Sequence, residues 1–284
     1  EKYCLVSLPL YPDKQDCVDY TPSLPGMRYL LPAERTLLGA SFLPSKGKEA
    51  WRQIGLLYQA WQRGVNIART LRDDAADTIV GCSGDLLDLP AAWVASRLLA
   101  RRFFVHFFDD YTEQWWADPH LRVFAGRVES RILGDAVKIL VTNEYMQAEI
   151  ASRHGRSSEI IRNPCQPGQL PAALERFPAE SGEVRLVFTG AVYHLNFDIL
   201  RAIVCALAMV EGVTHRLHIY TAQSKEQLEA EGLTGPHVAI HGHVTPEEAA
   251  DIQRSADILL IPFSFHEDAK GIIRTAATAK LADY

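Results

Sequence analysis

Near the end of the chain, a lysine and an acid stand three residues apart. Lys280 and Asp283 fall in a stretch with helical spacing, so one helical turn brings both side chains to the same face. A carboxylate accepts hydrogen bonds from vicinal hydroxyls, and a cation neutralises a phosphate. The pair therefore predicts a site that holds a nucleotide by its ribose and its phosphates. The alternative is an exposed helical ion pair, which contributes little to stability.

A second group of acids follows the strongest apolar run of the first half. Residues 102–108 predict a buried strand, and Asp109 and Asp110 come directly after it. Acids at the carboxyl end of a central strand stand where α/β proteins place their sites. We interpret both as candidate catalytic carboxylates, with an N-cap or turn pair and a metal-binding pair as the alternatives. Two adjacent acids are too few to require a metal, and no metal site is predicted.

Other polar and aromatic residues near strand ends are candidates for contacts to an acceptor. Ser83 and Gly84 follow the predicted strand 77–81, although turn chemistry explains them equally well. Trp115 offers an aromatic face for a sugar or a lipid-like tail, with core burial as the alternative.

The elements that would position Lys280 and Asp283 alternate regularly. Strands are predicted at 184–189, 216–220, 237–241 and 257–261, and helices at 196–210, 224–230 and 246–254, before a last helical stretch towards Tyr284. Such alternation is typical of a parallel sheet wrapped by helices, which binds ligands at the carboxyl ends of its strands. We expect residues 184–284 to form one domain.

The first half shows the same alternation, with a longer irregular start. Strands are predicted at 2–8, 36–42, 77–81, 102–108, 136–141 and 159–163, and helices at 48–72, 90–99, 121–133 and 144–153, the last capped by Asn143. A proline-rich polar stretch then predicts a linker at 173–183 after a first domain of residues 1–172. The fold class is α/β, with two Rossmann-like domains.

The helix predicted at 48–72 carries one apolar stripe. Its members recur at steps of three and four, and they are Trp51, Ile54, Leu57, Tyr58, Trp61, Val65, Ala68 and Leu71. A stripe of this kind indicates a face turned towards the core. A membrane-facing helix is the less favoured alternative, because the opposite face is not strongly basic.

Composition excludes several classes of protein. The net charge of -6 argues against a dedicated nucleic-acid binder. Five cysteines, odd in number and without metal-like spacing, indicate a reducing compartment rather than a disulfide framework. No apolar stretch approaches transmembrane length and no signal peptide is visible, so we expect a cytoplasmic protein with peripheral membrane contact left open.

Three runs occur in a characteristic order on the predicted elements. Residues 242–248 read Gly-His-Val-Thr-Pro-Glu-Glu, residues 256–262 read Ala-Asp-Ile-Leu-Leu-Ile-Pro, and residues 280–284 read Lys-Leu-Ala-Asp-Tyr. This order resembles the nucleotide-sugar-binding half of GT-B glycosyltransferases, in particular glycosyltransferase family four, and the resemblance covers most of the chain.

The resemblance implies glycosyl transfer from a nucleotide sugar to an acceptor hydroxyl of a glycan, a lipid-linked or a small molecule. It implies retention of configuration, two facing domains, no cofactor and no metal, with charge on the leaving diphosphate stabilised by cations and backbone donors. The donor-binding residues that it implies, together with nearby candidates, are Gly190, Asn196, Thr221, His243, His266, Glu267, Arg274, Lys280 and Asp283.

Several positions depart from the family pattern. Asp109 stands where a histidine is usual, with His106 three residues earlier, and Thr275 replaces one of two paired acids. The glycine-rich loop expected after the first strand has only a poor candidate in residues 25–28. These departures keep two alternatives open, which are a nucleotide-sugar epimerase of the same fold and a non-catalytic binding subunit. A generic dinucleotide-binding protein is less favoured, because no G-x-G-x-x-G follows a strand.

Both ends of the chain read as interrupted. The first strand begins almost at once, and Tyr284 falls inside a helical pattern without a cap. We therefore expect the family's donor-binding domain to continue beyond the residues given.

Overall fold

The computed structural model describes residues 5–7, 27–30, 45–163, 182–193 and 195–284. The chain divides into two compact units, each with its own parallel sheet. Unit 1 extends to Arg162 and also takes Arg274–Ala277, whereas unit 2 contains Asn163–Ile273 and Thr278–Tyr284. The predicted α/β class with two parallel sheets is confirmed. The predicted linker 173–183 lies almost wholly outside the described residues.

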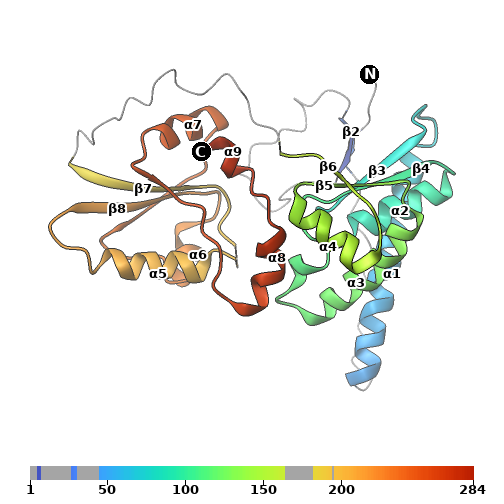
Figure 1. Cartoon of the computed structure of the whole chain (residues 1–284), viewed down its shortest axis with the longest axis horizontal. Helices are drawn as coiled ribbons and strands as arrows, with labels where there is room; N and C mark the ends of the chain where they lie inside the picture. The colour runs from blue at the N-terminus through green and yellow to red at the C-terminus, as the bar shows by residue number, and fades with distance from the viewer. Residues whose placement is uncertain (1–4, 8–26, 31–44, 164–181, 194) are drawn as a thin grey trace. The chain divides into compact units, whose positions relative to one another are not determined.

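The main sheet of unit 1 has strands in simple chain order. It runs β3(Thr78–Cys82), β4(Arg102–His106), β5(Lys138–Val141) and β6(Glu159–Ile160), all parallel. The helices α1(Ser45–Thr70), α2(Asp88–Leu98), α3(Pro119–Asp135) and α4(Glu144–His154) accompany it (Figure 1). The core forms where helices meet the sheet, and its most enclosed members include Leu89, Val105, Phe107, Tyr111, Phe124, Met146 and Ile150.

The start of the chain departs from the expected pattern. The strand predicted at 2–8 appears as β1(Leu5–Ser7), which pairs in parallel with β2(Met27–Leu30). Part of the predicted loop 25–28 therefore lies in a strand. The strand predicted at 36–42 lies outside the described residues.

The apolar stripe of α1 does not face the core along its first turns, which corrects the interpretation from sequence. Trp51, Ile54 and Leu57 are exposed, as are Tyr58 and Trp61. The buried side is a narrower one of small and polar residues, with Ala60 and Arg63 almost fully enclosed. The later stripe members Ala68 and Leu71 are buried in the core, so the predicted stripe marks the core-facing side at the end of the helix but not at its beginning.

The sheet of unit 2 has a crossover in its strand order. The order is β10(Ile258–Leu259), β7(Glu183–Thr189), β8(Thr214–Tyr220), β9(Val238–His241), again all parallel. The helices α5(Phe197–Leu207) and α6(Lys225–Ala230) lie on one face and α7(Pro246–Arg254) on the other (Figure 1). The chain leaves β7 in one direction and returns to its opposite side at β10. The carboxyl ends of these two strands thus form a topological switch point.

Local signals explain where the helices of unit 2 begin. Thr245 accepts a hydrogen bond from the backbone N–H of Glu248, whose side chain accepts one from Thr245, and Pro246 occupies the first turn. Ser224 and Gln227 form the same capping box at α6. The last helical stretch predicted from sequence is interrupted, because it divides into α8(Lys270–Thr275) and α9(Lys280–Asp283).

A row of polar rings crosses the middle of this sheet. His218 Nδ1 lies 3.0 Å from His241 Nε2, and Tyr220 stacks on His241 with ring centroids 4.2 Å apart. His218 Nε2 also lies 3.2 Å from a carboxylate oxygen of Glu183. Burial lowers the pKa of both histidines below the ordinary value, so the fold favours their neutral forms.

Candidate functional site

The switch point of unit 2 brings a glycine and a lysine together. Gly190 follows β7 and adopts φ +113°, a conformation that residues with a side chain rarely take. A Cβ placed there would lie 3.2 Å from Nζ of Lys280. Residues 90 positions apart in the sequence therefore meet where a parallel sheet offers its ligand site. A side chain at residue 190 would crowd the end of the lysine, so the glycine leaves room for the ammonium beside the backbone.

The ammonium of Lys280 has an aromatic neighbour as well. Its Nζ lies 5.1 Å from the ring centroid of Phe188, close enough for a cation–π interaction. Unit 2 as a whole is acidic, since residues 183–284 contain 8 Lys and Arg against 13 Asp and Glu. A cation fixed at the strand end thus opposes the prevailing charge of unit 2, which favours a local anion.

Asn196 fastens the two sides of the switch point to each other. Its Oδ1 accepts a hydrogen bond from the backbone N–H of Tyr193 at 3.1 Å, and its Nδ2 donates to the carbonyl of Pro262 at 2.8 Å. The residue is 4% exposed. The side chain of Asn196 therefore holds the loop after β7 against the loop after β10, and its donor-binding role stays a prediction.

Asp198, two residues further on, also joins the loop after β10 to the start of α5, although nothing in the sequence singled it out. Its Oδ2 accepts from the hydroxyl of Ser264 at 2.8 Å and from the backbone N–H of Phe265 at 2.7 Å. Burial alone would raise the pKa of Asp198, but these hydrogen bonds bring it below its usual range. The only available signal was an acid in the first turn of a helix, which is too common to be specific.

The end of β8 is tied into the same loops. Thr221 is 2% exposed and donates to Oε1 of Gln223 at 2.6 Å. That amide also accepts from the backbone N–H of Val192 at 2.8 Å and donates to the Val192 carbonyl. The hydroxyl of Thr221 is therefore engaged inside unit 2, and Gln223 was not anticipated from the sequence.

The remaining donor-site candidates lie at different places. His243, His266 and Glu267 are exposed on loops beyond β9 and β10, with Glu267 paired to Lys270 at 2.5 Å. Arg274 belongs to unit 1 and lies 3.4 Å from a carboxylate oxygen of Glu149. Asp283 shares the single turn of α9 with Lys280, as predicted.

At the strand ends of unit 1, Ser83 joins two neighbouring strands. Its hydroxyl accepts from the backbone N–H of Phe108 at 2.9 Å and donates to the carbonyl of Asp109 at 3.2 Å. The Asp109 side chain keeps access to solvent, yet partial burial raises its pKa above the ordinary value. Of the two predicted catalytic acids, this is the one that a ligand could reach.

Asp110 lies in a buried ionic network. Its side chain has no exposed surface, and Oδ2 lies 2.6 Å from Arg153. Oδ1 accepts hydrogen bonds from the backbone N–H groups of Thr112 and Glu113. Arg153 also lies 3.4 Å from Glu129, a second carboxylate that is 1% exposed. Both oxygens of Asp110 thus fix the loop that carries Asp109.

The other acceptor-site candidates are close to this loop. Trp115 is partly buried and packs against the core of unit 1, and among the described side chains none provides a hydrogen-bond partner for its Nε1. Gly84 is exposed, and a Cβ there would lie 2.8 Å from Oδ2 of Asp88. The predicted cap Asn143 is confirmed, because its Oδ1 accepts from the backbone N–H of Met146 at 2.8 Å.

Within the described ranges, no group of three or more His, Cys, Asp or Glu side chains is arranged to hold a metal ion. In the same part of the chain, no helix has the length and apolar character needed to cross a bilayer.

Comparisons with known proteins find structural likeness without sequence likeness. No protein-family model matches the sequence, and no curated protein matches it. Sucrose-phosphate synthase from Thermosynechococcus elongatus matches at 15% identity, over 92% of this chain and 67% of that one, with a TM-score of 0.56. Arabidopsis thaliana UGT89C1 matches at 12% identity, over 96% and 75% of the two chains, with a TM-score of 0.53.

A lower similarity extends to a putative UDP-N-acetylglucosamine 2-epimerase from Listeria monocytogenes. It is 10% identical, covers 76% of this chain and 60% of its own, and has a TM-score of 0.47, too low to bear on function. The two higher matches establish the fold alone. This chain has the α/β fold with two parallel sheets that GT-B glycosyltransferases have, while the narrower resemblance to family four stays a prediction.

Proposed function

We propose that this protein is a glycosyltransferase that moves a sugar from a nucleotide-sugar donor to an acceptor hydroxyl. The observation that carries the proposal is the position of the Lys280 ammonium against Gly190, at the switch point of unit 2. A fixed cation beside an open stretch of backbone suits a diphosphate, whose negative charge increases as the sugar leaves. The positive end of α5 begins in the same loops and adds to this stabilisation.

The strand order indicates how a bound nucleotide sugar would lie along the carboxyl edge of the sheet. Because β8 and β9 lie on one side of β7 and β10 on the other, a nucleotide sugar held at β7 extends both ways along the edge. We place the nucleoside at the ends of β8 and β9, near Thr221 and His243, with the ribose hydroxyls on Asp283. The sugar then lies beyond β10, near His266 and Glu267. Asn196 and Asp198 hold the loops after β7 and β10 in the positions that this ligand would contact.

In unit 1 we assign acceptor contact to the loops after β3 and β4. Asp109 is the proposed carboxylate for the acceptor hydroxyl, because its side chain reaches solvent at the end of β4 and its partial burial raises its pKa above the ordinary value. Ser83 and Asp110 are positioning residues for that loop, and Gly84 and Trp115 offer contact surface. The acceptor is a glycan or a lipid-linked molecule, the donor-sugar configuration is retained, and neither cofactor nor metal takes part.

A titration with nucleoside diphosphates tests the donor site. We expect one of UDP, GDP, ADP or dTDP to bind in isothermal titration calorimetry, and Lys280→Met to weaken that binding about tenfold or more. Lys270→Met is the matched control, since this lysine is in the same unit but is exposed and paired with Glu267. Equal affinity in wild type and Lys280→Met would show that the diphosphate is held elsewhere.

The reaction itself is tested with the sugar conjugate of the nucleotide that binds. Nucleotide release that depends on an added glycan or lipid-linked acceptor identifies a transferase. Conversion of the sugar nucleotide without an acceptor identifies an epimerase, and binding without either reaction identifies a non-catalytic subunit. We expect Asp109→Asn to slow acceptor-dependent release and to leave nucleotide affinity unchanged.

A further inference from the structure

The first half of α1 presents a row of large apolar side chains to solvent. The exposed fractions are 37% for Trp51, 50% for Ile54, 54% for Leu57, 37% for Tyr58 and 52% for Trp61. At three- and four-residue steps they form one strip about 15 Å long, and the rings of Tyr58 and Trp61 stack with centroids 6.2 Å apart. Such a contiguous patch on a protein surface usually marks an interaction site.

Contacts on the opposite side of the helix prevent this row from turning inward. Gly64 has no space for even a Cβ, which would lie 2.6 Å from side-chain atoms of Val94. Arg63 is 3% exposed and its guanidinium lies 2.7 Å from Asp85 and 2.6 Å from Asp88. The rotation of α1 about its axis is therefore fixed by buried polar contacts, and the aromatic row stays outside.

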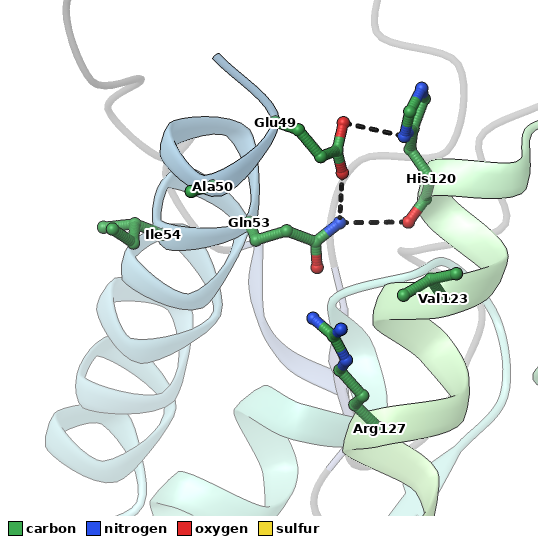
Figure 2. A pocket seen from close by; sticks show the side chains of 7 residues that line it. All are labelled: Glu49, Ala50, Gln53, Ile54, His120, Val123 and Arg127. Atoms are coloured by element: carbon green, nitrogen blue, oxygen red, sulfur yellow. Dashed lines mark hydrogen bonds and ion pairs between the residues drawn. The ribbon is translucent and has the colours of Figure 1, made fainter. Parts of the chain in front are cut away.

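A groove adjoins the row where α1 runs beside α3. Figure 2 shows its walls, which enclose a cavity of about 490 Å³. Glu49 accepts a hydrogen bond from Gln53 at 2.9 Å and lies 2.7 Å from Nδ1 of His120. Arg127 extends towards Gln53 from the other wall (Figure 2). The lining residues are Glu49, Ala50, Gln53, Ile54, His120, Val123 and Arg127.

Charge around the row favours an anionic partner. Lys48 and Arg127 are exposed beside it, and no ion pair to either is formed by the described residues. Glu49, the acid in the groove, is engaged by His120 and Gln53. Residues 45–163 contain 16 Lys and Arg against 15 Asp and Glu, whereas residues 183–284 have an excess of acids. Lys48 and Arg127 thus give the edge of the row a local positive charge, although the face opposite the row is not strongly basic.

We propose that the aromatic row of α1 and the adjoining groove dock on an anionic lipid surface. Tryptophan and tyrosine suit the boundary between headgroups and acyl chains, because their rings are apolar with one polar edge. A helix lying in the plane of the membrane buries such a row without crossing the bilayer. Arg127 and Lys48 then meet lipid phosphates at the rim. This docking does not depend on the proposed donor site, which lies in unit 2.

Vesicle flotation with the 284-residue chain tests the proposal. We expect binding to vesicles of phosphatidylcholine mixed with phosphatidylglycerol, weaker binding to phosphatidylcholine alone, and loss of the difference in high salt. The double variant Trp51→Ala with Trp61→Ala should reduce partitioning about tenfold, since binding scales with buried apolar area. Arg127→Gln should reduce it about fivefold on the anionic vesicles only.

Tyr145→Ala is the matched control, because this aromatic residue is 66% exposed on α4 of the same unit and lies outside the row. It should partition as the wild type does. The proposal is overturned if the wild type does not float with anionic vesicles, or if the double tryptophan variant floats equally well. It is also overturned if sedimentation shows a dimer that only the double variant dissociates, because a second copy would then be the occupant.

Discussion

The two sheets share parallel pairing but differ in strand order, and the difference decides where a ligand can be held. In unit 1 the described main strands follow one another in chain order, from β3 to β6. In unit 2 the chain returns to the other side of its first strand, so the ends of β7 and β10 lie next to each other with loops leading to opposite faces. Only this arrangement, within the described residues of the two main sheets, creates a switch point.

Polar residues at the strand ends are used differently as a result. In unit 1, the carboxylate of Asp110 is engaged in a buried ionic network with Arg153, whereas Asp109 remains accessible to solvent. In unit 2, Asn196 and Asp198 bind backbone groups of the flanking loops, while Lys280 lies beside a residue without a side chain. In both units, polar side chains at the strand ends thus hold the adjoining loops in place, and the candidates for chemistry are Asp109 in unit 1 and Lys280 in unit 2.

The largest expected effect comes from a substitution that breaks the buried ionic network of unit 1. Arg153→Met leaves Asp110 and Glu129 buried without their shared cation, which should cost about 3 kcal/mol of the free energy of unfolding. All five tryptophans lie between residues 51 and 116, so tryptophan fluorescence during urea unfolding reports on unit 1. The midpoint should fall while nucleotide affinity stays the same.

Arg162→Met is the control for this experiment. Its ion pair with Glu144 is exposed on both sides, so little stability should be lost. If the two variants unfold at the same urea concentration, the network is not what holds the Asp109 loop.

A smaller effect is expected at the switch point of unit 2. Gly190→Ala forces a side chain into φ +113° and places its Cβ against Lys280, so nucleoside diphosphate affinity should fall about tenfold. Gly212→Ala carries similar backbone strain, at φ +77°, but its Cβ would meet no atom within 4 Å. Both variants should lose about 1 kcal/mol of stability. Calorimetric titration should find weaker binding in the first alone, and a loss in both would attribute the effect to strain.

The smallest expected effect is a dependence of unit 2 on pH. Burial lowers the folded-state pKa of His218 and His241, so below about pH 6.5 the unfolded chain takes up more protons than the folded one. Stability should therefore be constant above neutral pH and decrease as pH falls through 6.5. Unfolding of unit 2 followed by tyrosine fluorescence at several pH values measures this slope.

The double variant His218→Gln with His241→Gln should show a flatter pH profile than the wild type. Glu183 faces His218 and partly opposes the shift, which is why we expect a gentle slope. A stability that rises as pH falls would contradict the neutral pairing of the two rings.

Local signals were sufficient for most elements of both units. The helix predicted at 246–254 has those bounds because its capping box and proline act within four residues. The position of Lys280 and Asp283 on the single turn of α9 was likewise predictable from spacing. The direction of the α1 stripe was not, because the close approach of Gly64 to Val94 depends on a second helix. Nor was the position of Asp198, whose partners come 66 and 67 residues later.

The sequence by itself determined the α/β class, the order of most strands and helices, and the residue types available for holding a nucleotide. Those properties follow from periodicity and capping, which act over a few residues. Only the tertiary structure decided that Lys280 meets Gly190, that Asp110 is buried on Arg153, and that the aromatic side of α1 is left outside. Each of these depends on contacts between distant segments, whose energies are set by burial and by competing partners rather than by neighbours in the chain.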